Sequence, residues 1–267
     1  MLGTWMFTPG TKEKYFGSGE KNKADVTILD LEDSVSQENK NTARENVVRY
    51  LESKNLTQKI AVRVNSLDTK DGINDLKALI ESKMEPDFIV IPKCNSAEIL
   101  KNVTGAFKNE NKKTVAIPMI ETMKSIDMLL ELEKEEVPYA LFGSADLSDE
   151  LNIVNDWDNL NYIRNKIIDF ASRNGVQMID TPYFNVKDLE GVEQEAIKVK
   201  NMGFRGKLVI YPAQVEKINK VFNITEEQIE WANKVLEINK AGVGTLDGQM
   251  IDEAIAKRAR AILKNIS

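Results

Sequence analysis

Short apolar runs rich in β-branched residues alternate with longer segments of helical period along most of the chain. Eight such runs stand out, at residues 3–7, 26–30, 60–64, 88–92, 114–118, 139–143, 176–180 and 207–211. Helical segments lie between them, for example at 39–53, 71–83, 122–135, 158–174 and 187–202. This alternation is typical of βα units built around a parallel sheet.

The number of runs selects among the parallel α/β folds. Eight strands predict a closed (β/α)8 barrel, the TIM barrel. An open, doubly wound sheet usually has fewer strands and often a Gly-rich first turn. No GxGxxG or P-loop pattern follows any of the eight runs, so the barrel is favoured.

The chain continues beyond the eighth run through two further helical segments separated by a glycine-bearing loop. No linker rich in Pro or Ser sets them apart. We therefore expect one domain, a barrel over residues 1–222 with a carboxyl-terminal helical extension over residues 223–267, and no internal repeat.

Composition narrows the function. The 36 Lys and Arg residues against 42 Asp and Glu residues give a net charge of −6, which disfavours nucleic acid or an anionic membrane as the main partner. No apolar run approaches the roughly 20 residues of a membrane span, and the amino terminus does not resemble a signal peptide. The single cysteine, Cys94, fits a reducing compartment, so we expect a cytoplasmic protein.

The chain contains no histidine. Imidazole-dependent triads, histidine-ligated zinc and a histidine general base are therefore excluded. Chemistry must come from carboxylates, Lys, Arg, Tyr, backbone amides or a bound metal. The lone thiol of Cys94, beside Lys93, is expected to pack in the core rather than to react.

Charged residues gather at the carboxyl ends of the predicted strands, where an α/β barrel builds its active site. The residues at these ends are Asp30, Glu32, Asp33, Arg63, Asn65, Lys93, Glu121, Asp146, Asp180 and Tyr211. Any one of them could be an ordinary solvated loop residue. Asp33 in particular is expected to be a loop or helix-capping residue.

Arg63 lies between Val62 and Val64 inside an apolar strand. An unpaired guanidinium would be costly there, so Arg63 should meet a carboxylate of the barrel mouth or of a ligand. The alternative is an arginine fixed to Asp30 or Glu32 for stability alone.

Glu121 and Asp146 follow adjacent predicted strands and are the best metal candidates. Two carboxylates, water and an oxygen-rich substrate make a usual Mg²⁺ site, whereas zinc is disfavoured without His or several Cys ligands. The alternative is two unrelated surface acids.

A set of short segments, taken in order, resembles the citrate lyase beta-subunit family within the HpcH/HpaI aldolase superfamily. The segments are FTPG, LDLEDSV, RVN, IPK, IPMIET, FGSADL, IDTPYFN, GFRGKLVIYPAQV and GQMID, spread over about residues 6 to 260. Each is weak alone, but nine in register are specific.

The resemblance implies a carbon–carbon lyase that makes or breaks a 3-hydroxyacyl thioester such as citryl-, malyl- or citramalyl-CoA. The products would be a 2-oxo acid and an acetyl thioester. Matching positions imply that Glu121 and Asp146 hold Mg²⁺ and that Arg63 binds the 2-oxo acid. Asp30 and Glu32 would lie against Arg63 and the metal's waters.

The resemblance also implies a homotrimer or hexamer. Asp252 of the GQMID segment would reach the site from a neighbouring subunit's carboxyl-terminal lid and move a proton at the acetyl carbon. Its alternative is to cap the last helix, since EAIAKRARAIL follows directly. Lys12 and Lys14 would face the CoA phosphates or an acyl carrier protein, and Pro182 and Tyr211 would contact the substrate.

The chain departs from the family at two places. Tyr211 stands where relatives usually have histidine, and the first loop carries lysines without the arginine common in CoA lyases. These departures leave open the acyl group and the choice between CoA and carrier protein. Thioester hydrolysis and a non-catalytic, carrier-binding subunit remain as alternative functions, and an aldolase acting without CoA is a further one.

Overall fold

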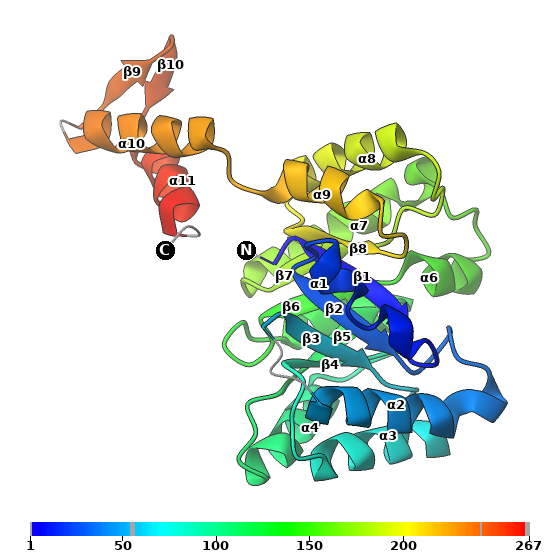
Figure 1. Ribbon diagram of the computed structural model, residues 1–267. Coiled ribbons are helices and arrows are strands. Elements are labelled where there is room, and N and C mark those ends of the chain that lie inside the picture. Colours follow the sequence, from blue (N-terminus) through cyan, green and yellow to red (C-terminus); the bar gives the residue numbers. More distant parts are fainter. Residues whose placement is uncertain (1, 54–56, 241, 265–267) are drawn as a thin grey trace. The chain divides into compact units, whose positions relative to one another are not determined.

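Eight parallel strands close into a barrel in the computed structural model, which describes residues 2–53, 57–240 and 242–264 (Figure 1). Each strand pairs with the next in sequence, and the last pairs with the first through Thr4 and Lys207. The predicted TIM barrel is thereby confirmed. The strands are β1 (Thr4–Pro9), β2 (Val26–Asp30), β3 (Lys59–Arg63), β4 (Phe88–Ile91), β5 (Val115–Ile120), β6 (Tyr139–Phe142), β7 (Gln177–Asp180) and β8 (Gly206–Val209).

The strands are nearly continuous apolar runs because both of their faces are covered. In β2 all five residues, from Val26 to Asp30, are buried. Strands of a parallel sheet covered by helices show this pattern, whereas strands with one wet face alternate between apolar and polar residues. The pairing registers Asp30 with Arg63 on β3, so the two polar residues meet at the same edge of the barrel.

Helices connect the strands and lie on the outside of the barrel (Figure 1). They are α1 (Ser18–Lys21), α2 (Lys40–Ser53), α3 (Lys70–Glu81), α4 (Ala97–Asn109), α5 (Met123–Met128), α6 (Ser144–Leu151), α7 (Trp157–Arg173), α8 (Leu189–Met202) and α9 (Gln214–Phe222), with short 3-10 turns η1 (Glu13–Tyr15), η2 (Gln37–Asn39) and η3 (Leu129–Glu131). The predicted segments at 39–53, 71–83, 158–174 and 187–202 match α2, α3, α7 and α8 to within two residues.

The helix predicted over 122–135 is shorter than expected. It ends at Met128, continues as a single 3-10 turn, and gives way to extended backbone at Leu132, whose side chain is buried. Glutamates at 131, 133, 135 and 136 would lie at the negative end of the helix dipole if the helix continued, which is unfavourable. The chain therefore leaves the helix before these glutamates, and Leu132 is buried in an extended conformation.

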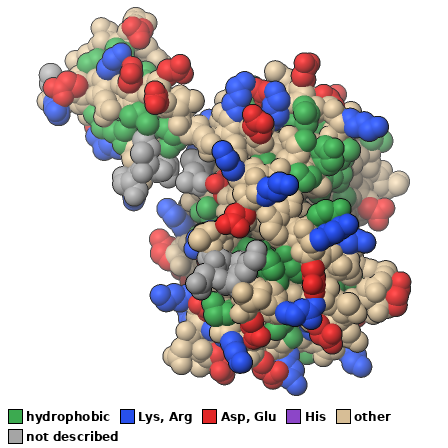
Figure 2. Space-filling view, viewed as in Figure 1, with side chains coloured by type: hydrophobic (Ala, Val, Ile, Leu, Met, Phe, Trp, Pro, Cys, Tyr) green, Lys and Arg blue, Asp and Glu red, His purple; other side chains and the backbone are tan. Residues whose placement is uncertain are grey.

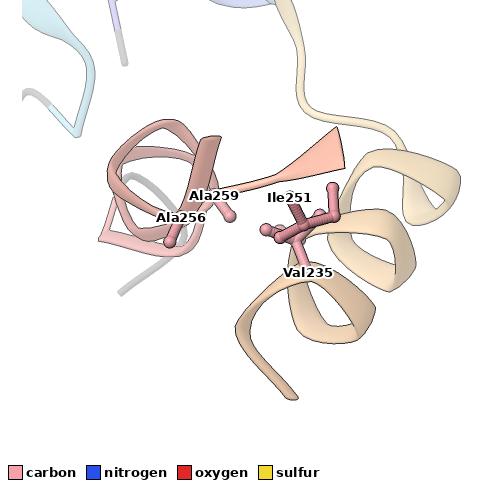
Figure 3. Packing of buried hydrophobic residues seen from close by; sticks show 5 residues of the cluster. Val235, Ile251, Ala256 and Ala259 are labelled. Atoms are coloured by element: carbon pink, nitrogen blue, oxygen red, sulfur yellow. The ribbon is translucent and has the colours of Figure 1, made fainter. Parts of the chain in front are cut away.

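Backbone contacts divide the chain into two compact units, residues 2–221 and a second unit that begins at Phe222. The second unit contains α10 (Glu226–Lys240), the antiparallel hairpin β9 (Gly244–Leu246) and β10 (Gln249–Ile251), and α11 (Glu253–Lys264). Its core is small: Val235, Ile251, Ala256 and Ala259 pack together with Ala232 (Figure 3). The hairpin between the two helices was not predicted, because its strands have three residues each.

The surface carries both signs of charge. Figure 2 shows Lys and Arg side chains interspersed with Asp and Glu rather than gathered into one patch on the face in view. Within the described residues, no helix combines the length and the apolar character needed to cross a bilayer.

Candidate active site

A cavity of about 400 Å³ opens at the carboxyl ends of the strands. Acidic side chains and Arg63 line one part of it, and apolar side chains with three hydroxyl residues line the rest. The lining residues are Phe7, Pro9, Asp30, Asp33, Ser34, Arg63, Met119, Glu121, Gly143, Ser144, Ala145, Asp146, Thr181, Pro182, Phe184, Leu208 and Ile210. The sequence predicted charged or polar residues at the ends of β2 to β8, and each of these strand ends contributes to the lining except that of β4.

Arg63 is held to Asp30 by two parallel hydrogen bonds. Nε donates to Oδ1 at 2.7 Å and Nη2 donates to Oδ2 at 2.8 Å. The backbone N–H groups of Glu32 and Ser34 also donate to the Asp30 carboxylate. Burial alone would raise the pKa of Asp30, but the guanidinium and these donors outweigh it and hold the pKa below its usual value. The predicted contact between Arg63 and a strand-end carboxylate is present.

Nη1 of Arg63 has two further acidic neighbours. It lies 3.1 Å from Glu32 Oε2 and 3.0 Å from Asp33 Oδ2. Asp33 is a loop residue, as predicted, but its carboxylate also contacts Arg63. The guanidinium stacks 4.8 Å from the centre of the Phe7 ring, which fixes its plane. Burial, and then repulsion by neighbouring acids, raises the pKa of Glu32 to about 8.

Glu121 follows β5 and is almost fully buried. The backbone N–H of Lys93 donates to its Oε1 at 2.6 Å. Lys93 adopts a left-handed conformation with φ of 49°, and this turn directs its N–H toward the carboxylate. Gly143 lies against the other oxygen: a Cβ there would be 2.8 Å from Glu121 Oε2. Burial raises the pKa of Glu121 to about 7.

Asp146 lies in the first turn of α6 and is half-exposed. Nζ of Lys93 approaches its Oδ2 at 3.2 Å, so this one lysine contacts both predicted metal ligands. Ser144, at the start of α6, pairs with Thr181: the two hydroxyl oxygens are 2.7 Å apart, and the Ser144 N–H donates to Thr181 Oγ1. The loops after β6 and β7 are thus joined beside Asp146.

The site holds more acidic than basic side chains. Five carboxylates, those of Asp30, Glu32, Asp33, Glu121 and Asp146, interact with two cations, Arg63 and Lys93. The raised pKa values of Glu32 and Glu121 reflect this surplus as well as burial. A divalent cation would offset it, and the donor set of two carboxylates suits Mg²⁺.

The carboxylates do not form a complete metal cage alone. Among residues 2–53, 57–240 and 242–264, no group of three or more Asp, Glu or Cys side chains is arranged to hold a metal ion by itself. Mg²⁺ commonly keeps several waters and takes one or two protein carboxylates together with substrate oxygens. Glu121 and Asp146 fit that partial role.

Asp180, which the sequence placed at the barrel mouth, belongs instead to a buried network between the barrel and its helices. Its carboxylate accepts from Lys207 Nζ at 2.6 Å and from Arg164 Nε at 2.9 Å. Lys207 also donates to Glu195 and to the carbonyl of Thr181. The sequence did not reveal this network, because Lys207 lies in an apolar strand and both partners are far from Asp180 in sequence, by 27 residues for Lys207 and 16 for Arg164.

The predicted substrate contacts are divided by the structure. Pro182, after β7, lines the cavity, but after β8 the lining residue is Ile210 rather than Tyr211. Lys12 and Lys14 are exposed on the loop that follows β1 and do not line the cavity. They remain candidates for contacts with a substrate that extends out of the mouth.

Asp252 belongs to the second compact unit. Its Oδ1 accepts from the N–H of Ile255 at 3.0 Å, and its carbonyl accepts from Ala256. The aspartate therefore caps α11, as the alternative interpretation of the sequence proposed. Capping uses one carboxylate oxygen, so a role in proton transfer stays a prediction.

Cys94 is buried, with its Sγ near Ser96 O and Met128 Sδ. Burial raises the pKa of the thiol to about 11, which keeps it protonated at neutral pH. Cys94 therefore packs in the core, as the sequence predicted.

Comparison with known proteins places this chain in a family. The model of the HpcH/HpaI aldolase/citrate lyase family matches residues 4–212. The chain is 30% identical to citrate lyase subunit beta of Leuconostoc mesenteroides subsp. cremoris, over 98% of this chain and 92% of that protein. It is 27% identical to citramalyl-CoA lyase of Rattus norvegicus, over 97% and 84%. It is 31% identical to (3S)-malyl-CoA thioesterase of Cereibacter sphaeroides, over 97% and 92%.

A solved structure supports the same relationship. CitE from Mycobacterium tuberculosis, in complex with magnesium, acetoacetate and coenzyme A, superposes with a TM-score of 0.79 at 25% identity, covering 98% of this chain and 97% of that one. The resemblance predicted from the nine segments is confirmed, and with it the prediction of an enzyme of the lyase type. This chain belongs to the HpcH/HpaI aldolase/citrate lyase family.

Proposed function

We propose that this member of the family is a Mg²⁺-dependent carbon–carbon lyase acting on a 3-hydroxyacyl thioester. The products would be a 2-oxo acid and an acetyl thioester. One observation carries the proposal: Glu121 and Asp146 line the same cavity as an arginine that is already fixed by Asp30. Cleavage of this type needs positive charge at the 2-oxo acid and at the developing oxyanion.

Glu121 and Asp146 would hold the metal. When bound, Mg²⁺ supplies a Lewis acid that polarises the oxygen atoms of the 2-oxo acid. Support comes from the surplus of carboxylates in the site and from the solved relative that contains magnesium and coenzyme A. The N–H of Lys93 and the close approach of Gly143 hold Glu121 in place before any ligand arrives.

Arg63 would bind the carboxylate of the 2-oxo acid and stabilise the oxyanion. Its two bonds to Asp30 and its stacking on Phe7 fix the guanidinium in advance, so little reorganisation is needed at reaction. Glu32 and Asp33 contact the remaining nitrogen, Nη1. The incoming carboxylate would compete with them for that nitrogen.

Asp252 would move the proton at the acetyl carbon. We infer that it comes from the second unit of a neighbouring copy in a trimer or hexamer, since the family resemblance assigns this residue to a lid. Lys12 and Lys14 would meet the phosphates of CoA or the acidic surface of a carrier protein. Pro182 and Tyr211 would contact the substrate outside the reacting atoms.

Thioester hydrolysis is a second candidate. It is favoured by the 31% identity to a (3S)-malyl-CoA thioesterase and by the presence of Asp252. Hydrolysis and cleavage release different products from one substrate. Malyl-CoA would give free malate and CoA on hydrolysis, and glyoxylate and acetyl-CoA on cleavage.

Product analysis therefore tests the proposal. The enzyme is incubated with malyl-CoA or citramalyl-CoA and Mg²⁺, and the 2-oxo acid and free thiol are both followed. We expect 2-oxo acid without stoichiometric free thiol. Free thiol without 2-oxo acid would replace the lyase with the hydrolase.

A further inference from the structure

The cavity contains few cations for its number of acids. Its charged lining residues are Asp30, Asp33, Glu121 and Asp146 against Arg63. Arg63 is the only Lys or Arg among the described residues that line it. A bound divalent cation would engage Glu121 and Asp146 and leave Arg63 shared among the others.

Arg63 has little capacity left for additional anions. Nε and Nη2 are used by Asp30, and Nη1 already meets Glu32 and Asp33. One substrate carboxylate can be served by Nη1 together with a metal. The nearest other cation, Lys93, stands outside the lining residues and contacts Asp146.

The remaining wall of the cavity carries no charge, and its side chains are apolar except for the hydroxyl groups of Ser34, Ser144 and Thr181. Phe7, Met119 and Leu208 lie at the barrel mouth, and Leu208 is almost completely buried. Pro182, Phe184 and Ile210 continue this wall outward. A second carboxylate on the substrate would lose hydration against this wall without gaining a cation as its partner, which is costly.

We propose that the carbinol carbon of the substrate carries a small uncharged substituent, a methyl group or a hydrogen atom. The 2-oxo acid product is then a monoanion of the pyruvate or glyoxylate type, and a dicarboxylate of the oxaloacetate type is rejected. This inference rests on the proposed lyase function and specifies its substrate class. The candidate substrates share the first carboxylate and the thioester, so the enzyme would discriminate between them at the second carboxylate, for which the cavity lining offers no second cation.

The test compares three thioesters that differ only at that carbon: citramalyl-CoA with methyl, malyl-CoA with hydrogen, and citryl-CoA with carboxymethyl. With Mg²⁺ present, kcat/KM for the better of the first two should exceed that for citryl-CoA by about 10² or more. An equal or higher value for citryl-CoA overturns the inference and leaves the lyase function intact.

A charge-insertion variant tests the mechanism of rejection. Ile210→Arg places a guanidinium on the cavity wall and should raise the citryl-to-citramalyl ratio of kcat/KM about five- to tenfold. Ile197→Arg on α8 is the matched control, since both isoleucines are 39% exposed and only Ile210 lines the cavity. Phe184→Arg serves if the first variant fails to fold. An unchanged ratio in the folded variants contradicts the proposal.

Binding separates failure of this inference from failure of the lyase function. If none of the thioesters is cleaved, the proposed function has failed, and the inference is decided by the change in Tm with Mg²⁺ and either pyruvate, glyoxylate or freshly dissolved oxaloacetate. Greater stabilisation by pyruvate or glyoxylate supports it. Greater stabilisation by oxaloacetate, or none by any of them, overturns it.

Discussion

Asp30 and Arg63 lie in register on neighbouring strands, and the guanidinium of Arg63 donates two hydrogen bonds of 2.7 and 2.8 Å to the carboxylate of Asp30. The pair closes the end of both strands and presents Nη1 to the cavity. The register between β2 and β3 therefore determines where the guanidinium stands in the cavity.

Arg63→Lys should lower turnover by about 10² or more, although it keeps the charge. Lysine cannot make the two parallel bonds to Asp30 and also direct a donor into the cavity. Steady-state kinetics with the preferred thioester measures the loss, and Tm reports how much of it is structural. A rate near that of the wild type would assign Arg63 a stabilising role only.

Asp146→Asn should abolish Mg²⁺-dependent activity and leave the fold intact, because Asp146 is half-exposed and its loss removes one metal ligand. Asp149→Asn, on an exposed position of the same helix, is the matched control and should retain activity. Titration of activity against Mg²⁺ concentration compares the two variants. Equal Mg²⁺ responses would exclude Asp146 as a ligand.

Lys93→Gly should have a free energy of unfolding about 1 kcal/mol higher than that of Lys93→Ala, because residue 93 has a left-handed backbone conformation, which glycine adopts without strain. The glycine variant keeps the N–H that holds Glu121 and removes the ammonium beside Asp146. We expect tighter Mg²⁺ binding in this variant, measured by calorimetry. Weaker binding would show that the ammonium assists the metal rather than competing with it.

The metal response should depend on pH. Because the pKa of Glu121 is raised to about 7, the metal-free folded state keeps a proton that the unfolded chain releases near pH 4.5. Stability in EDTA should thus fall from about pH 4.5 to about 7, and Glu32, with a pKa raised to about 8, extends the fall.

Mg²⁺ requires the ionised carboxylate, so the rise in Tm caused by Mg²⁺ should be larger at about pH 8 than at about pH 6. Differential scanning fluorimetry across this range, with and without EDTA, makes the comparison. Glu121→Gln should weaken the dependence. A Mg²⁺ effect independent of pH would contradict the assignment of Glu121.

Mixed oligomers test whether Asp252 acts on a neighbouring copy. Asp252→Asn and Asp146→Asn should each be inactive alone, and co-expression of the two should restore part of the activity, because some cavities would combine an intact lid with an intact metal site. Light scattering verifies that the copies associate. Absence of recovery in verified mixed oligomers would refute action between copies.

Local patterns were sufficient to predict the barrel, since eight apolar runs and their spacing determine which residues stand at the strand ends. The same logic located Asp30, Arg63, Glu121 and Asp146, all of which line one cavity. The early end of α5 and the hairpin after α10 escaped prediction, because the first depends on helix-end electrostatics and the second on very short strands.

Apart from the pairing of Arg63 with a strand-end carboxylate, contacts between distant segments could not be predicted in this way. The N–H of Lys93 reaches Glu121 only through a left-handed turn, and Phe7 meets Arg63 only because the barrel brings their strand ends together. Asp180 was misplaced because its side chain is buried outside the cavity, where it pairs with Lys207 of β8 and Arg164 of α7.

The most direct test of the central claim is cleavage of citramalyl-CoA or malyl-CoA by the wild-type enzyme in Mg²⁺ and in EDTA, with 2-oxo acid as the measured product. We expect 2-oxo acid to form in Mg²⁺ and to disappear in EDTA, with recovery when Mg²⁺ is restored. Formation of 2-oxo acid that persists in EDTA would contradict the metal-dependent lyase.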